Sequence, residues 1–321
     1  MAKTEMKKKR KIDIMAEMPE RLSSGHRLCA GCGASIAARQ ILRGTTDPVV
    51  ISCATGCLEV ASTIYPYTAW EVPFIHNAFE NSAATISGVE AAFRSLKKQG
   101  KIPKNKKIKF VAFGGDGGTY DIGIQSLSGA LERGHDFVYV CYDNEAYMNT
   151  GIQRSSATPF GAFTNTSPAG SCSFGKSQFR KDLTMICAAH HIPYAAQASI
   201  GYWQDLVKKA EKALAVEGPA FLLVLAPCPR GWRFPMEKTV EIGKLAVDTC
   251  FWPLYEIENG VFKLTKKIPD KKKKPITEWL KSQGRFKHLF EECNENVIEE
   301  IQQKIDEDWQ RYLKTNGDKI F

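Results

Sequence analysis

The cysteine residues are spaced in a way that suggests a metal site. Cys29 and Cys32 form a Cys-x-x-Cys motif that runs into a predicted helix at Gly33, which directs two thiolates at one metal. Two ligands do not complete a site. The candidates for the others, each near the end of a predicted strand, are Cys53, Cys57 and Cys228. By chemistry alone, zinc, a [4Fe–4S] cluster and a redox-active dithiol all fit this spacing.

A second group of polar residues follows two predicted strands. The glycine-rich segment 113–118 contains Asp116, and about 26 residues separate Gly117 from Asn144, which ends the next strand. That interval fits one loop, a helix of about 12 residues and a returning strand of about 7, so both side chains arrive at the same sheet edge. Two side-chain oxygens beside glycines whose N–H groups can approach phosphate predict Mg²⁺ bridging a diphosphate.

The elements that position these residues alternate between strand and helix. The hydrophobic pattern predicts helices over residues 33–43, 82–98, 122–133, 180–190, 202–216, 236–248 and 296–312. It predicts strands over residues 48–52, 108–113, 137–142, 194–198 and 221–225. This alternation is typical of a doubly wound, mainly parallel α/β sheet with right-handed crossovers, which binds ligands outside the carboxyl ends of its strands. Segment 151–175 is too long for a simple connection and is interpreted as a functional loop.

Changes in composition divide the chain into three parts. Residues 1–24 are charged and aperiodic, and we interpret them as a tail or an arm on a partner. Residues 25–235 form the ligand-binding domain, and the more charged residues 236–321 form a C-terminal helical extension.

The charge and the apolar runs exclude several classes of protein. The formal net charge is +9, but two short basic stretches, in residues 3–11 and 266–274, account for more than the whole excess, so we expect no nucleic-acid partner. No stretch approaches the ~18 apolar residues of a membrane span, and no apolar signal run follows the basic N-terminus. We therefore expect a cytoplasmic protein without a membrane partner, in which the ten cysteines stay reduced.

The Gly-Asp-Gly motif with its spaced asparagine resembles the metal–diphosphate motif of thiamine-diphosphate enzymes. The resemblance implies that Asp116 and Asn144 bind Mg²⁺ through their side chains and that Ala146 adds a backbone carbonyl. Gly115 and Gly117 then belong to the cofactor site.

Over residues 26–260 the chain resembles the β subunit of pyruvate:ferredoxin oxidoreductases. The matching motifs lie in segments 25–33, 54–57, 65–70, 114–118, 143–156 and 228–232. The resemblance implies the thiamine-diphosphate-binding fold, with Thr55 and Gly56 at the cofactor and Asn149 at the substrate. It also selects the ligands of a [4Fe–4S] cluster, which are Cys29, Cys32, Cys57 and Cys228. Cys53 is then a spectator, and Arg230 stands where many relatives have threonine.

The same resemblance implies a catalytic subunit that oxidatively decarboxylates pyruvate with coenzyme A to acetyl-CoA and CO₂. Electrons would pass through the [4Fe–4S] cluster to ferredoxin. One partner subunit would supply the glutamate that activates thiamine diphosphate, and another would be a ferredoxin-like cluster subunit. The alternatives are another 2-oxoacid (branched-chain, 2-oxoglutarate or oxalate), a non-redox thiamine-diphosphate decarboxylase or carboligase, and a non-catalytic scaffold subunit.

Overall fold

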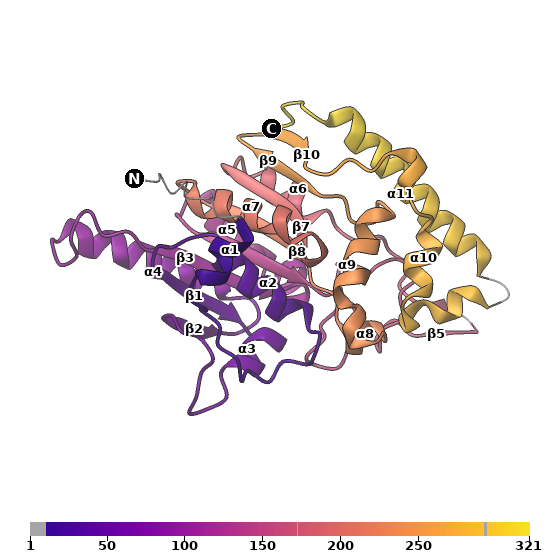
Figure 1. The fold of residues 1–321 in the computed structure, drawn as a ribbon, viewed down its shortest axis with the longest axis horizontal. Helices are drawn as coiled ribbons and strands as arrows, with labels where there is room; N and C mark the ends of the chain where they lie inside the picture. The colour runs from indigo at the N-terminus through magenta and orange to yellow at the C-terminus, as the bar shows by residue number, and fades with distance from the viewer. Residues whose placement is uncertain (1–10, 172, 292–293) are drawn as a thin grey trace, which may run out of the picture.

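The fold is a layered α/β structure built on one central sheet (Figure 1). The computed structural model describes residues 11–171, 173–291 and 294–321. The sheet has eight strands in the order β10-β9-β7-β8-β4-β3-β1-β2. Their bounds are β1 Val49–Ala54, β2 Phe74–Asn77, β3 Lys109–Gly115, β4 Val138–Asp143, β7 Tyr194–Ser199, β8 Ala220–Leu225, β9 Tyr255–Glu258 and β10 Val261–Leu264. Within this sheet the neighbouring pairs β2–β1, β1–β3, β3–β4, β4–β8 and β8–β7 are all parallel, which confirms the predicted fold class.

The central strands β4 and β8 are buried along their whole length. Their sequences, VYVCYD and AFLLVL, are nearly continuous apolar runs, as expected of strands covered on both faces. Gly115 of β3 lies opposite Tyr142 of β4, and Asp143 lies opposite Leu225 of β8. The register therefore brings the carboxyl ends of three neighbouring strands level with one another.

Helices cover both faces of the sheet. On one face α2 (Gly33–Leu42) and α7 (Trp203–Ala215) enclose one hydrophobic core. On the other, α4 (Ser82–Lys98), α5 (Ile124–Glu132) and α6 (Leu183–Ala188) enclose a larger one. The predicted helices at 33–43, 82–98 and 202–216 are thus confirmed to within a few residues.

The C-terminal region is not only a helical extension, because part of it belongs to the central sheet. Strands β9 and β10 form an antiparallel hairpin that pairs with β7 and continues the sheet. Helices α9 (Thr239–Asp248), α10 (Ile276–Lys281) and α11 (Glu295–Thr315) add to the larger core, and α11 runs along its outer flank in Figure 1. Position 235 as a domain boundary stays a prediction.

Several short elements were not predicted from the sequence. They include α1 (Lys11–Glu17), α3 (Cys57–Ser62), α8 (Pro229–Trp232), α10, β2, a π-helical turn (Gly118–Ile122), 3₁₀ turns (Ile200–Tyr202, Asp270–Lys272, Gly284–Phe290) and the small hairpin of β5 (Ala169–Gly170) and β6 (Ser173–Phe174). The predicted helix at 236–248 begins with a 3₁₀ turn (Met236–Lys238) and continues as α9. Helix α1 lies in the segment interpreted as a tail, where its seven residues are too few to produce a clear periodicity. Most of the N-terminal basic run lies outside the described residues.

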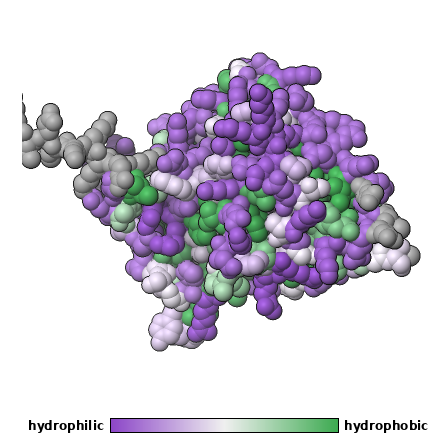
Figure 2. Space-filling model, turned by 45° about the vertical axis from the view of Figure 1, so that its right-hand side comes forward, coloured by the Kyte–Doolittle hydropathy of each residue, from purple (hydrophilic) through white to green (hydrophobic). Residues whose placement is uncertain are grey.

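The surface is mainly hydrophilic. Figure 2 shows polar side chains over most of one face, with hydrophobic side chains gathered in patches between them. Among the described residues, no helix combines the length and the apolar composition that crossing a membrane requires.

Candidate active site

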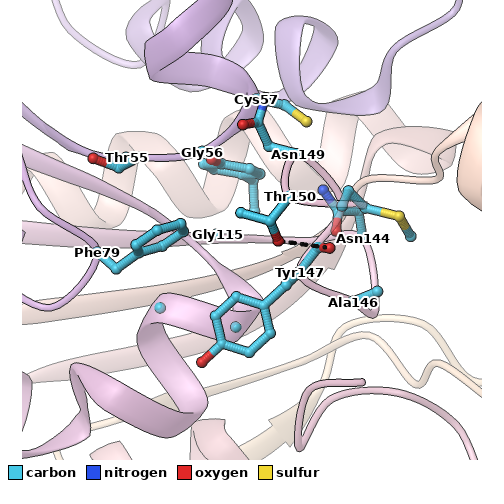
Figure 3. A pocket seen from close by; sticks show the side chains of 14 residues that line it. Thr55, Gly56, Cys57, Phe79, Gly115, Asn144, Ala146, Tyr147, Asn149 and Thr150 are labelled. Carbon is cyan, nitrogen blue, oxygen red and sulfur yellow. Dashed lines mark hydrogen bonds between the residues drawn. The ribbon is translucent and has the colours of Figure 1, made fainter. Parts of the chain in front are cut away.

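A cavity opens at the carboxyl ends of β1, β3 and β4, where the parallel sheet is expected to bind ligands (Figure 3). It is lined by Thr55, Gly56, Cys57, Phe79, Gly115, Gly117, Gly118, Tyr142, Asn144, Ala146, Tyr147, Met148, Asn149 and Thr150. All the predicted cofactor residues except Asp116 line it directly. Asp116 is fully buried and contacts the backbone N–H of Asn144 at 3.3 Å.

Three oxygen acceptors converge beside this cavity. One terminal atom of the Asn144 amide lies 2.9 Å from both the carboxylate of Asp116 and the backbone carbonyl of Ala146. It donates to both when it is the nitrogen, and it is a third acceptor when it is the oxygen. Three acceptors this close repel one another unless the amide turns over or a cation lies among them. Neighbouring ligands of an octahedral Mg²⁺, each 2.0–2.1 Å from the metal, are about 2.9 Å apart. This donor set therefore fits Mg²⁺.

The buried charges around the trio favour a cation at Asp116. Asp143 is paired with Arg180 at 2.8 Å and Glu145 with Arg285 at 2.5 Å. Among the described residues, Asp116 has no such pair, and its second oxygen accepts a 2.5 Å hydrogen bond from Ser155. Burial, and then the neighbouring carboxylate of Asp143, raise the pKa of Asp116 well above its ordinary value. A bound cation would offset both effects.

The glycines of the Gly-Asp-Gly motif lie where the cavity wall has no room for a side chain. A Cβ atom on Gly117 would lie 2.5 Å from the ring of Tyr147, so only glycine fits here without displacing that ring. Tyr142 presents a buried hydroxyl without a hydrogen-bond partner among the described residues, close to Gly56 and Gly115. A phosphate group at this wall could accept its hydrogen bond.

The loop 151–175 packs beneath the acceptor trio. Besides the Ser155 contact, Thr158 donates a hydrogen bond to the carbonyl of Glu145 at 2.7 Å. The buried amine of Lys176 donates to the carbonyls of Ser156 and Thr158 and so holds the loop from behind. The loop 151–175 thus packs against the segment that carries Asp116, Asn144 and Ala146.

The cysteines come together because the N-terminal motif docks on the end of β8. The N–H of Gly33 donates to the carbonyl of Pro227 at 3.2 Å, directly before Cys228. A Cβ atom on Gly33 would lie 2.5 Å from the backbone of Ala226, so glycine permits this approach. Cys57 begins α3 at the rim of the cavity, beside Asn149 (Figure 3).

Four thiols lie within electrostatic reach of one another. Burial, and then the other thiols of the group, raise the pKa of Cys57 to about 12. Burial raises the pKa of Cys32 to about 11, where two backbone N–H groups oppose the smaller effect of Cys228 and Cys29. The same causes raise the pKa of Cys228, although two backbone N–H groups oppose them. A polycationic centre would offset this repulsion. No three Cys, His, Asp or Glu side chains in the described part of the chain converge closely enough for a single ion.

The other cysteines lie apart from this group. Cys53, Cys141, Cys187 and Cys250 are buried and free. Cys172 and Cys293, also interpreted as structural thiols, lie outside the described residues.

Some site residues were not found from the sequence, and some suggested ones lie elsewhere. Phe79, Tyr142 and Tyr147 line the cavity. The only signal for them in the sequence is that they lie close to the motifs. His76, in β2, is 58% exposed and contacts Glu59 at 2.8 Å, and it does not line the cavity. Among the described residues that line the cavity, none is acidic.

Residues 54–224 match the family described as thiamine pyrophosphate enzyme, C-terminal TPP binding domain. The pyruvate synthase subunit PorB of Methanocaldococcus jannaschii is 58% identical to the chain, over 92% of the chain and 97% of that protein. The chain belongs to the PorB family. It is a thiamine-diphosphate-dependent oxidoreductase subunit of the 2-oxoacid:ferredoxin class.

Further relatives define the breadth of the PorB family. The PorB subunit of Thermotoga maritima is 54% identical over 91% of each chain. The ketoisovalerate oxidoreductase subunit VorB of Pyrococcus furiosus is 45% identical over 95% of this chain and 96% of that protein. A solved structure of 2-oxoglutarate:ferredoxin oxidoreductase from Magnetococcus marinus shares the fold, with a TM-score of 0.52, 18% identity and coverage of 75% of this chain and 82% of that one.

Proposed function

We propose that this PorB-family chain holds thiamine diphosphate, Mg²⁺ and a [4Fe–4S] cluster, and that its complex oxidatively decarboxylates pyruvate with coenzyme A. The products are acetyl-CoA and CO₂, and ferredoxin takes the electrons. One observation carries the proposal: an acceptor trio suited to Mg²⁺ and four mutually close thiols meet at one sheet edge.

The residues divide the work between two sets. Asp116, Asn144 and Ala146 would hold Mg²⁺ on the diphosphate, and Cys29, Cys32, Cys57 and Cys228 would hold the cluster. When bound, thiamine diphosphate supplies the electron sink for decarboxylation of a 2-oxoacid, and the cluster accepts electrons singly. Asn149 extends from the cavity wall toward Cys57 and can orient a polar substrate group between the two cofactors.

The site needs a partner subunit. Activating thiamine diphosphate requires a carboxylate, and Glu80 does not line the cavity, while Glu145 is buried against Arg285. A partner would therefore supply the activating glutamate, and a ferredoxin-like partner would carry electrons onward. Consequently the isolated chain, loaded with all three cofactors, should not oxidise pyruvate at the rate of the complex.

Pyruvate is favoured over a branched-chain 2-oxoacid because the two PorB relatives are more similar to the chain than the VorB relative is. The runner-up substrate is therefore ketoisovalerate.

The test is to purify the native complex anaerobically and to measure reduction of ferredoxin with pyruvate, ketoisovalerate, 2-oxoglutarate and oxalate, each with and without coenzyme A. Iron, sulfide, magnesium and thiamine diphosphate are measured on the same sample. The expected result is coenzyme A-dependent oxidation that is fastest with pyruvate. A colourless complex that contains zinc, or one that decarboxylates pyruvate without reducing ferredoxin, would contradict the proposal.

A further inference from the structure

A buried arginine from the C-terminal region connects the acceptor trio with the group of four cysteines. Arg285 lies in the 3₁₀ segment Gly284–Phe290, and its side chain is 3% exposed. Its guanidinium donates to the carboxylate of Glu145 at 2.5 Å, across 140 positions of the chain. Glu145 follows Asn144 directly, so this ion pair holds the backbone between two predicted Mg²⁺ ligands.

The same guanidinium also contacts the segment that follows Cys228. It lies 3.9 Å from the ring centroid of Trp232, in the short helix α8 that follows Cys228. The indole N–H of Trp232 donates to the carbonyl of Asn144 at 2.7 Å. These contacts close a ring of four residues, Arg285, Glu145, Asn144 and Trp232, which we call the linking ring.

The backbone in the linking ring is held in a conformation that it would not adopt freely. Glu145 has a φ of 66°, in the left-handed region that a residue with a long side chain rarely occupies. Its carboxylate is fully buried, between Arg285 and the guanidinium of Arg180 at 3.7 Å. The ion pairs thereby fix the direction in which the Ala146 carbonyl points.

A buried ion pair stabilises a fold less well than apolar side chains of the same size would, and its best-attested advantage is to specify one geometry. The linking ring connects segments 144–146 and 228–232, whose only shared task in the proposed function is to hold the two cofactors. Its location therefore indicates a positioning role.

We propose that Arg285 is a positioning residue which, through Glu145 and Trp232, fixes the Mg²⁺–diphosphate site and the cluster site relative to one another. The inference rests on the proposed function. It assigns to the C-terminal region a positioning part in the cofactor site, which an extension that only covers the core would not have.

The test uses the whole complex and four variants: Arg285→Met, Arg285→Lys, Glu145→Gln and the double variant E145Q/R285M. The matched control is Lys209→Met, which removes another buried cation, 1% exposed and paired with Asp205 at 2.7 Å, that contacts neither cofactor segment. Thiamine-diphosphate affinity is measured by calorimetry with Mg²⁺, the cluster midpoint potential by redox titration, and stability by chemical denaturation.

We expect Arg285→Met to weaken thiamine-diphosphate binding at least tenfold and to lower the midpoint potential, because a positive charge near the cluster favours its reduced state. Glu145→Gln should raise the potential, and Arg285→Lys should retain part of the affinity. The double variant, without a lone buried charge, should regain stability but not affinity. Lys209→Met should lose stability alone.

Two outcomes overturn the proposal. If Arg285→Met and Lys209→Met alter stability equally and leave affinity and potential unchanged, the ring is only structural. The same follows if the double variant recovers affinity together with stability. These failures differ from failure of the proposed function, in which the wild-type complex itself would hold neither thiamine diphosphate nor iron.

Discussion

The acceptor trio and the cysteine group lie side by side but are built in opposite ways. Asp116 and Asn144 come from adjacent strands joined by one crossover, and they are 0% and 7% exposed. The four cysteines come from three segments that span residues 29 to 228, and Cys29 is exposed. The first set is fixed by the sheet register, whereas the second is assembled by loops and short helices.

This difference indicates how each site tolerates the absence of its ligand. Ser155 donates a buried hydrogen bond to Asp116, and Thr158 donates one to the carbonyl of Glu145 between Asn144 and Ala146, so the protein pre-organises the trio. The cysteines have few such contacts and repel one another when ionised, so the proposed cluster would supply much of their order. Damage to a cysteine should therefore have the larger and less local effect.

The largest effect is expected from Cys228→Ser. Loss of one thiolate from a loosely assembled group should release iron from the whole cluster and lower pyruvate oxidation by about a hundredfold or more. The control is Cys53→Ala, which alters a buried thiol of β1. Iron and sulfide content and ferredoxin reduction are measured on both complexes. Loss of iron from the Cys53 variant instead would show that the ligand set is wrong.

Asp116→Ala should have a more local effect. It removes the carboxylate of the trio, and Mg²⁺-dependent thiamine-diphosphate binding should weaken by about a hundredfold while the iron content is kept. Asp136→Asn, which alters a carboxylate that only receives the N–H of Gly218 at 3.2 Å, is the control. Calorimetry with and without Mg²⁺ measures both. Unchanged affinity in the Asp116 variant would remove the basis for the cation site.

Gly117→Ala should weaken cofactor binding without removing a ligand. Its methyl group would meet the ring of Tyr147 at 2.5 Å, and the displaced ring should lower affinity about tenfold, or roughly 1.4 kcal/mol. Gly88→Ala in α4 points into open space and should stabilise the fold by about 0.5–1 kcal/mol. Equal affinities of the two variants would mean that the glycine wall is not part of the site.

The smallest effect concerns the pH dependence of the supporting loop. Burial lowers the pKa of Lys176 from 10.5 to about 8, so its charged form costs stability in the folded state. The full cost is present below about pH 8 and falls as the pH rises towards 10.5, because the folded state releases its proton first. Relative to Lys176→Met, the wild type should gain unfolding free energy as the pH rises from about 8 to about 10.5. A constant difference would contradict this assignment.

Much of the fold could be predicted because most of it is locally encoded. The helix predicted at 82–98 is α4, and the strand at 221–225 is β8 with one more residue, because long periodic or apolar runs define them. The hairpin of β9 and β10 was missed because its strands have four residues each and follow a region of charged composition. Only pairing with β7 defines them as part of the sheet.

The candidate site also contains residues that could be predicted from the sequence and residues that could not. Asp116 and Asn144 could be placed together from strand spacing alone, since parallel strands end at one edge. Spacing could not choose between Cys53 and Cys57, and the choice depended on resemblance to a family. Arg285 could not be predicted at all, because nothing near it in the sequence indicates that its partner lies 140 positions earlier.

The docking of Gly33 on Pro227 has a consequence for biogenesis. During translation at about 5–20 residues per second, the N-terminal cysteine pair leaves the ribosome roughly 10–40 s before Cys228 is synthesised. Over that interval the nascent chain presents an exposed dithiol with no completed site. A site shared by the N-terminal cysteine pair and Cys228 can therefore be completed only after translation has passed Cys228.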